Sequence, residues 1–208
     1  MTKKKVLILS GGGADQMNTS LRDGFVALGH EAGIYFGDQP SRYLSMMKLS
    51  HRAGFDSSAI MYWQKFKEAN DASYEKAIMT FGPDVIFMIG FNSITSRLVR
   101  KLTKTYHIPT AYVVIADPFA VDPVNSYYVD CFVDCSHLFF HAPDSMPAVR
   151  LISSAHMTPF AFPGDPAFYR PLGVKKEFDI FMLGQFSSLS ASTATKAYIL
   201  DTLCAEGF

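Results

Sequence analysis

Short apolar runs alternate with longer amphipathic segments along most of this chain. Five of the runs are typical of buried strands: KKVLILS (4–10), EAGIYFG (31–37), VIFMIG (85–90), AYVVIA (111–116) and HLFFHA (137–142). Continuous apolar runs separated by helical patterns are characteristic of strands in a parallel sheet. The pattern therefore predicts an α/β fold, a Rossmann-like parallel sheet with helices on both faces.

The segments between these runs carry helical spacing. In 18–29 the apolar residues recur at Leu21, Phe25 and Leu28, and Gly29 is a suitable end. A second helix is expected over 60–81, a third after residue 93 with Asn92 or Ser93 as its cap, and shorter ones over 123–134 and 143–152. The intervening residues 38–57 are polar and rich in turn formers, which predicts a long loop.

A proline-rich stretch, PFAFPGDPAFYRPL (159–172), interrupts this alternation. A further apolar run, FDIFMLG (178–184), and a helical pattern over 194–205 follow it. We interpret residues 1–158 as one Rossmann-like domain, 159–176 as a linker, and 177–208 as the first βα unit of a second domain. One strand and one helix cannot bury their own apolar faces, so the second domain is expected to be incomplete.

Composition narrows the class of protein. The chain has 208 residues, 49% of them apolar, with 19 basic and 19 acidic residues. The balanced charge gives no global field for nucleic acid or an anionic membrane. Three cysteines argue against a disulfide framework, and no apolar run is long enough for a signal peptide or a membrane span. We therefore expect a cytoplasmic protein.

Candidate binding residues follow the strands, because ligands of open parallel sheets bind beyond the carboxyl ends of the strands. Gly11, Gly12 and Gly13, with Asp15, come after the first run, and Asn92 comes after the third. A glycine loop before a helix suits a phosphate, but a tight turn without a ligand explains the glycines equally well. The dinucleotide fingerprint is half met, because Gln16 stands at its third glycine position, and the loop is not a Walker loop.

Asp117 follows the AYVVIA run and precedes a proline. A carboxylate at a strand end could act as a general base toward a hydroxyl, or it could bind a sugar hydroxyl. The competing interpretation is an aspartate that hydrogen-bonds the backbone of its own turn. His141 is a second candidate for the base, because it also ends a strand.

Cys131, Cys135, His137 and His141 lie close together in the sequence. Their spacing matches neither a zinc ribbon nor a zinc finger. Buried cysteines and partnered histidines explain them better, and we expect no metal site in this set.

Several of these segments, in their order, resemble the GT-B glycosyltransferases, and most closely the spore-maturation, CgeB-like family. The resemblance rests on PDVIFMIGFN, IPTAYVVIADP, FAFPGDPAFYRP and FDIFMLGQFSS. It implies two facing Rossmann-like domains, of which the first binds the acceptor and the second the nucleotide-sugar donor, without an obligatory metal. By this analogy Gly11 to Gly13 face the donor phosphates or the acceptor, Asp117 lines the cleft, and Gly184 belongs to the donor side.

The chain departs from the family in two ways. The family has an arginine near the helix after Gly184, whereas the nearest cation here is Lys196. Most of the second domain is also expected to be missing from this stretch, so the stretch alone is expected to be inactive.

Two other functions stay open. One is a Rossmann-like module that binds a nucleotide or sugar without chemistry. The other is a nicotinamide-dependent oxidoreductase with Asp38 on the ribose, which Gln16 and the linker both disfavour.

Overall fold

The structure is a computed structural model that describes residues 2–10, 15–37, 45–46, 49–50, 53–89, 94–115, 118–119 and 129–161. The chain divides into two compact units, Met1–Pro163 and Gly164–Phe208. The described residues all belong to the first unit. The linker and the predicted second βα unit lie outside them, so the domain boundaries stay a prediction.

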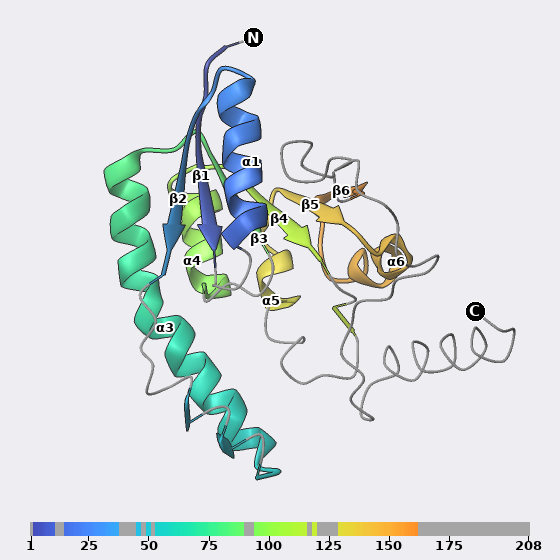
Figure 1. Cartoon of the computed structure of the whole chain (residues 1–208). Helices are drawn as coiled ribbons and strands as arrows, with labels where there is room; N and C mark the ends of the chain where they lie inside the picture. The colour runs from blue at the N-terminus through green and yellow to red at the C-terminus, as the bar shows by residue number, and fades with distance from the viewer. Residues whose placement is uncertain are drawn as a thin grey trace, which may run out of the picture. The chain divides into compact units, whose positions relative to one another are not determined.

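The centre of the unit is a parallel sheet of six strands (Figure 1). Their bounds are β1 Lys5–Ser10, β2 Glu31–Phe36, β3 Val85–Ile89, β4 Thr110–Val114, β5 His137–Phe140 and β6 His156–Pro159. The order is β2-β1-β3-β4-β5-β6, and every neighbouring pair is parallel. The predicted α/β class, with a doubly wound Rossmann-like sheet, is therefore confirmed.

Helices connect the strands. Their bounds are α1 Asp15–Ala27, α3 Asp56–Phe81, α4 Ser96–Arg100, α5 Val129–Phe132 and α6 Met146–Val149, with a π-helical segment over Lys101–Thr105 and a 3-10 turn over Pro143–Ser145. Gly29 and Gly82 have φ values of 84° and 63°, the left-handed conformation that ends a helix. None of the helices in the described ranges is long and apolar enough to cross a bilayer.

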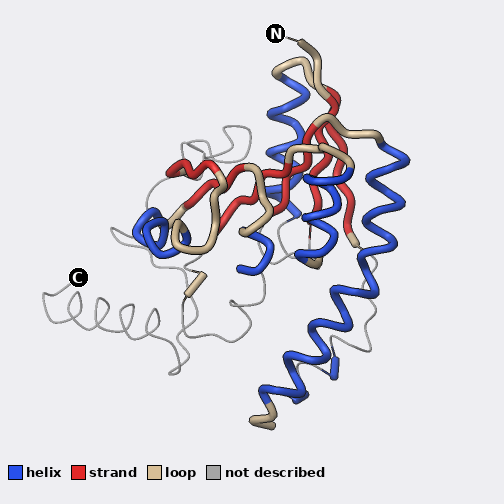
Figure 2. The backbone as a smooth tube through the Cα atoms, turned by 180° about the vertical axis from the view of Figure 1, so that it is seen from behind, coloured by secondary structure: helices blue, strands red, loops and turns tan. Residues whose placement is uncertain are grey.

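The two faces of the sheet carry separate apolar layers, because side chains of a strand alternate between its faces. On one face Ile8, Ile89 and Val113 pack with Leu21 and Phe25 of α1. The other face holds the larger core, in which residues of α3, α4 and α5 pack against the strands, with Tyr35 of β2 at its margin. Its buried members include Leu7, Leu9, Tyr74, Ile78, Met88, Leu98, Tyr112, Phe132, Phe140 and Met157. Figures 1 and 2 show this arrangement, with α1 on one side of the sheet and α3 and α4 on the other.

The element boundaries correct several predictions. Thr95, not Asn92 or Ser93, caps α4, since its hydroxyl accepts a hydrogen bond from the Leu98 N–H. Helical backbone at residues 45–46 and 49–50 interrupts the predicted 38–57 loop, and α3 begins four residues before the expected 60. Strand β6 was not expected at all. Leu28 lies beyond the end of α1 and is exposed.

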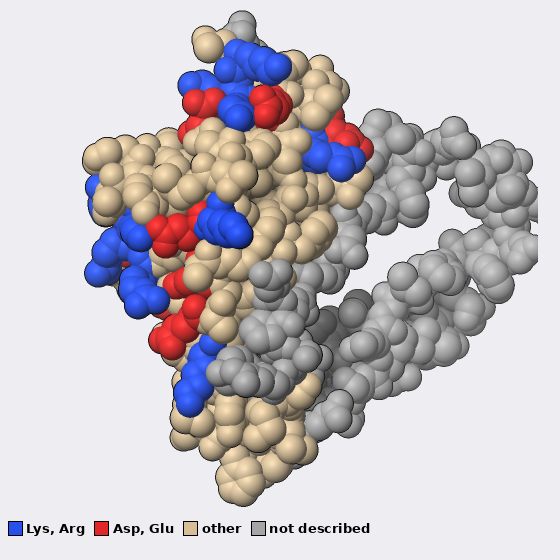
Figure 3. Space-filling model, turned by 90° about the vertical axis from the view of Figure 1, so that its left-hand side faces the viewer, with Lys and Arg blue, Asp and Glu red and all other residues tan. Residues whose placement is uncertain are grey.

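The surface charges are mixed in sign. On the face shown in Figure 3, blue and red side chains are interspersed rather than gathered into a single patch. Three cations of α4 and its π-helical continuation pair with acids: Arg97 with Asp71, Arg100 with Asp134, and Lys101 with Glu75. These three cations are exposed, and the acids that they pair with largely neutralise their charge.

Candidate functional site

The first four strands of the chain end at one level of the sheet. Ser10, the last residue of β1, is the register partner of both Phe36 in β2 and Ile89 in β3. Ile89 in turn pairs with Val113 of β4. The strand order reverses between β1 and β3, and ligands of doubly wound sheets bind at such a switch point. The carboxyl ends of β1 and β3 are therefore the candidate site.

The residues predicted to form the site follow these strand ends in the sequence. Gly11, Gly12, Gly13, Asn92 and Asp117 lie outside the described residues, as does Gly184. Asp15 begins α1, but its side chain is not described. The roles assigned to all of them stay predictions.

The second candidate for the base is visible. His141 directly follows β5, its side chain is exposed, and its backbone N–H donates to the Val114 carbonyl at 3.0 Å. It therefore leaves the sheet at the same edge, two strands away from the switch point.

Two buried polar side chains meet where β1 ends. The amide nitrogen of Asn18, in α1, donates to the hydroxyl of Ser10 at 2.7 Å, and both residues are buried. The carbonyl oxygen of Asn18 accepts no hydrogen bond from the described residues. Buried amide oxygens in proteins usually accept a hydrogen bond, so Asn18 has an acceptor to offer at this strand end.

Helix α3 brings further polar groups from the opposite face. Its N-terminal half runs beyond the carboxyl ends of β1 and β2 (Figure 1). There the Lys67 side chain is 2% exposed and lies 3.3 Å from Asp130, the second residue of α5. Asn70, one helical turn before Tyr74, is buried, and its carbonyl oxygen also accepts nothing from the described residues. A buried cation and a buried amide thus lie within two turns before Tyr74, whose hydroxyl donates to the Ser10 carbonyl at the end of β1.

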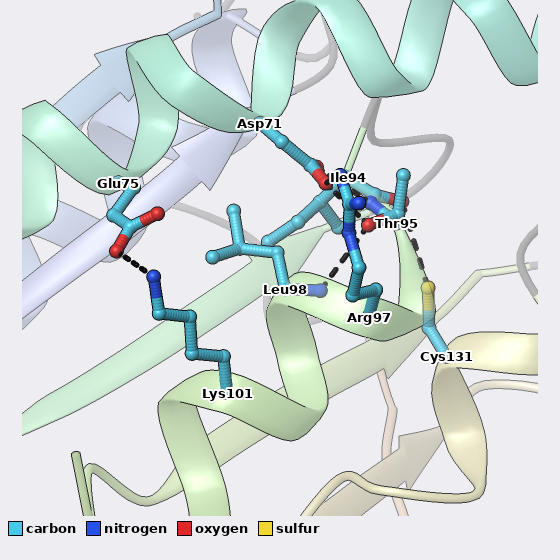
Figure 4. A network of polar contacts seen from close by, with 8 residues as sticks. All are labelled: Asp71, Glu75, Ile94, Thr95, Arg97, Leu98, Lys101 and Cys131. Carbon is cyan, nitrogen blue, oxygen red and sulfur yellow. Dashed lines mark hydrogen bonds and ion pairs between the residues drawn. The ribbon is translucent and has the colours of Figure 1, made fainter. Parts of the chain in front are cut away.

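Asp71 fixes the start of α4 (Figure 4). Its carboxylate accepts hydrogen bonds from both the backbone N–H and the hydroxyl of Thr95. Burial raises the pKa of Asp71, and the Thr95 hydrogen bonds and the Arg97 charge only partly oppose that shift. Because Thr95 is the N-cap of α4, Asp71 fixes the position at which this helix begins after β3.

Glu75 forms a second contact between the same helices, one turn further along α3 (Figure 4). It accepts from Lys101 and from the hydroxyl of Tyr106. These two hydrogen bonds lower the pKa of Glu75, so this carboxylate is charged at neutral pH. The contact holds α3 against the π-helical continuation of α4.

The two cysteines within the described ranges are not placed for nucleophilic chemistry. Cys131 and Cys135 are both buried, and burial raises the pKa of the Cys135 thiol to about 12. Since the thiolate is the reactive form, both groups are inert at neutral pH. No three His, Cys, Asp or Glu side chains gather around a common point within the described part of the chain.

The sequence interpretation missed Asn18, Lys67, Asn70 and Asp71. A signal was available for Asn70, because it falls on the row of α3 that also carries Phe66, Tyr74 and Ile78, each four residues from the next. A polar residue in an apolar row of this kind indicates a buried polar contact.

Comparison with known proteins gives distant structural likenesses. No protein-family model matches the chain, and no curated protein does. Among solved structures, UDP-GlcNAc 2-epimerase from Neisseria meningitidis bound to UDP-GlcNAc matches 71% of this chain and 42% of its own, with 12% identity and a TM-score of 0.48. The Methanocaldococcus jannaschii UDP-GlcNAc 2-epimerase, in complex with UDP-GlcNAc and UDP, matches 74% and 46%, with 13% identity and a TM-score of 0.47.

The glycosyltransferase SnogD from Streptomyces nogalater matches 95% of this chain and 63% of its own, at 11% identity and a TM-score of 0.46. The chain therefore spans between 42% and 63% of the length of these structures.

Proposed function

We propose that this chain is the N-terminal part of a GT-B glycosyltransferase, which moves a sugar from a nucleotide-sugar donor to an acceptor hydroxyl. One observation carries the proposal: β1, β3 and β4 end in register around the switch point of the sheet. The three segments that follow these ends contain the glycine triplet, Asn92 and Asp117. The proposed substrate class, a nucleotide-sugar, is based on the order of motifs that resembles the CgeB-like family.

The reaction would be a displacement at the anomeric carbon. The acceptor hydroxyl attacks that carbon, the bond to the nucleoside diphosphate breaks, and the diphosphate leaves with the bonding electron pair. In an inverting enzyme Asp117 takes the proton of the hydroxyl. The glycine loop offers backbone N–H groups to the phosphates or the acceptor. The donor side, including Gly184, belongs to the second domain.

The described polar residues support a ligand at this edge. Lys67 is a buried cation, and cations stabilise the charge of a diphosphate. The carbonyl oxygens of Asn18 and Asn70, which accept nothing from the described residues, can each accept a hydrogen bond from a sugar or ribose hydroxyl. Together these groups provide charge and hydrogen bonding from both helical layers.

Calorimetric titration of the chain with UDP, UDP-GlcNAc and NAD⁺ tests the proposal. We expect UDP and UDP-GlcNAc to bind weakly, because the second domain is expected to supply most donor contacts, and NAD⁺ to bind less well. Tight NAD⁺ binding that is lost in Asp38→Ala would replace the proposal with the oxidoreductase. Release of UDP from UDP-GlcNAc by a longer chain that includes the second domain, abolished by Asp117→Asn, would establish transfer chemistry.

A further inference from the structure

Exposed apolar side chains gather around the beginning of α3, on the part of this helix that runs beyond the sheet. Among the large apolar residues that the described ranges leave exposed, five fall close together in the sequence: Met46, Leu49, Phe55, Ile60 and Met61. We call these five residues the apolar tip. Figure 3 shows no charged group among the described side chains at its lower end, where α3 begins. Apolar side chains exposed in one group usually mark an interaction surface.

A glycine turn connects the two most exposed members of the apolar tip. Gly54 has a φ of 76°, and the Phe55 N–H donates to the Ser50 carbonyl at 2.8 Å. This is the hydrogen bond of a Schellman motif, in which the residue after the glycine lies beside the last turn of the preceding helix, which here carries Leu49. Leu49 and Phe55 are nevertheless 62% and 65% exposed, so packing within the chain leaves most of each side chain in water.

The first turns of α3 bury one side of the helix and leave apolar residues on the other sides. Ala59 and Phe66 are buried. Ile60 and Met61 directly follow Ala59, so they point away from it by about 100° and 200° around the helix axis. The solvent face of a surface helix is normally polar. The core of the sheet therefore does not account for Ile60 and Met61.

Basic residues are in excess around the apolar tip. The sequence from 42 to 65 has one acidic residue, Asp56, and four basic ones, Arg42, Lys48, Arg52 and Lys65, whereas the whole chain has 19 of each sign. Lys65, whose side chain the structure describes, is exposed. Basic residues next to exposed apolar ones are typical of segments that bind the surface of an anionic membrane.

From the exposed apolar side chains and the local positive charge we propose that the apolar tip binds the surface of a bilayer that contains anionic lipid. The apolar side chains enter the boundary between headgroups and acyl chains, and the basic residues contact lipid phosphates. A second copy of the chain would set like charges against each other, whereas an anionic surface complements them.

Docking of the apolar tip also orients the sheet. The first half of α3 runs beyond the carboxyl ends of β1 and β2 (Figure 1), so binding brings that edge of the sheet toward the bilayer. The inference is independent of the glycosyltransferase proposal, because none of the five residues belongs to the switch point of the sheet.

Sedimentation of the 208-residue chain with lipid vesicles tests the proposal. We expect the chain to bind vesicles of phosphatidylglycerol and phosphatidylcholine in equal parts at least about tenfold more tightly than pure phosphatidylcholine vesicles, and less tightly as NaCl is raised. Trp63 is the single tryptophan of the sequence and comes two residues after Met61. Its fluorescence should shift to shorter wavelength when the mixed vesicles are added.

A double variant, Leu49→Gln with Phe55→Gln, removes the two most exposed members of the apolar tip. Its affinity for the mixed vesicles should fall by more than about tenfold, because less apolar surface enters the bilayer. Both side chains are mostly in water, so the fold should persist. Leu151→Gln is the matched control, because Leu151 is even more exposed and lies just after α6, outside the apolar tip. It should bind the vesicles as the parent does.

The measurements on the parent chain need no variant and decide the lipid dependence by themselves. The proposal is wrong if the parent does not bind the mixed vesicles, or binds pure phosphatidylcholine equally well. It is also wrong if the double variant binds as tightly as the parent. Dimers of the parent that the double variant does not form, seen by analytical ultracentrifugation without lipid, would replace the bilayer with a second copy of the chain.

Discussion

The hydroxyl of Tyr74 donates a hydrogen bond to the carbonyl oxygen of Ser10, with 3.2 Å between the two oxygens. Tyr74 lies in the C-terminal half of α3, and Ser10 is the last residue of β1. Both are buried. The contact fixes the long helix against the strand whose end forms the candidate site, so the geometry of that site depends on residues that are distant from it in sequence.

Gly37 leaves room for this contact, and its replacement should disturb it. A Cβ atom at Gly37 would lie 2.5 Å from the Tyr74 hydroxyl oxygen. Gly37→Ala should therefore displace Tyr74 and lower the free energy of unfolding by about 1–3 kcal/mol. Urea denaturation measures the change.

Gly24→Ala is the matched control for this substitution. A Cβ at Gly24, in α1, would have nothing within 4 Å. Alanine is the better helix former, so this variant should be more stable than the parent by up to about 1 kcal/mol. Equal stabilisation by both alanines would show that Tyr74 does not approach Gly37 as closely as described.

Asp71 should tolerate asparagine better than alanine. Asp71→Ala leaves the buried N–H and hydroxyl of Thr95 without their acceptor, which should cost about 1–3 kcal/mol. Asp71→Asn keeps an acceptor for the N–H and removes a carboxylate whose pKa burial has raised. The lost ion pair with Arg97 matters little, because that side chain is 79% exposed. Urea denaturation of the two variants measures the difference.

The pH dependence of these variants follows from the sign of the shift. Because the pKa of Asp71 is raised in the folded chain, the folded chain holds this proton more tightly than the unfolded chain. The contribution of Asp71 to stability therefore falls as the pH rises from its ordinary pKa of 3.8 through the raised folded value. Across that pH window the free energy of unfolding of Asp71→Asn should rise relative to that of the parent, as urea denaturation at a series of pH values measures. A difference between the two free energies that stays constant with pH would contradict the raised pKa.

Substitution of Lys67 distinguishes a ligand-binding role of this side chain from a purely structural one. Removing one partner of an ion pair is costly when the charge left behind is buried, but Asp130 is 46% exposed and keeps contact with water. Lys67→Met should therefore remain folded, with its free energy of unfolding within about 2 kcal/mol of the parent. We expect its affinity for UDP to fall nevertheless, because the proposed cationic partner of the diphosphate is lost.

Lys65→Met controls for the loss of charge on the same helix. Lys65 is exposed on α3, two residues before Lys67. Its replacement should change neither stability nor UDP affinity appreciably. If Lys67→Met binds UDP as well as Lys65→Met does, the cation serves the fold alone.

The continuous apolar runs made the sheet predictable. A strand buried on both faces requires apolar residues at almost every position, as in β4, where all five residues are buried. β6 has the sequence HMTP, in which only Met157 is buried, so it has no such run and was missed. As an edge strand it needs to bury only one face and to pair on one side.

The candidate site was predictable as an edge of the sheet but not as a set of side chains. Parallel topology alone places residues after β1, β3 and β4 together. The contact of Lys67 with Asp130 joins positions 63 residues apart, and nothing local to either residue signals it. The same is true of Asp71 and Thr95, whose pairing depends on how α3 packs beside α4.

The central claim is that the carboxyl ends of β1 and β3 bind the phosphates of a nucleotide-sugar, whose other contacts are expected to come from the second domain. Its most direct test is an NMR titration of the ¹⁵N-labelled chain with UDP-GlcNAc, following every backbone amide. We predict that shifts concentrate at Ser10 to Gly13, at Asn18 and at Ile89 to Asn92, and that β6 is unaffected. Shifts that are absent, or that fall elsewhere on the sheet, would contradict the assignment of this edge as the nucleotide-sugar site.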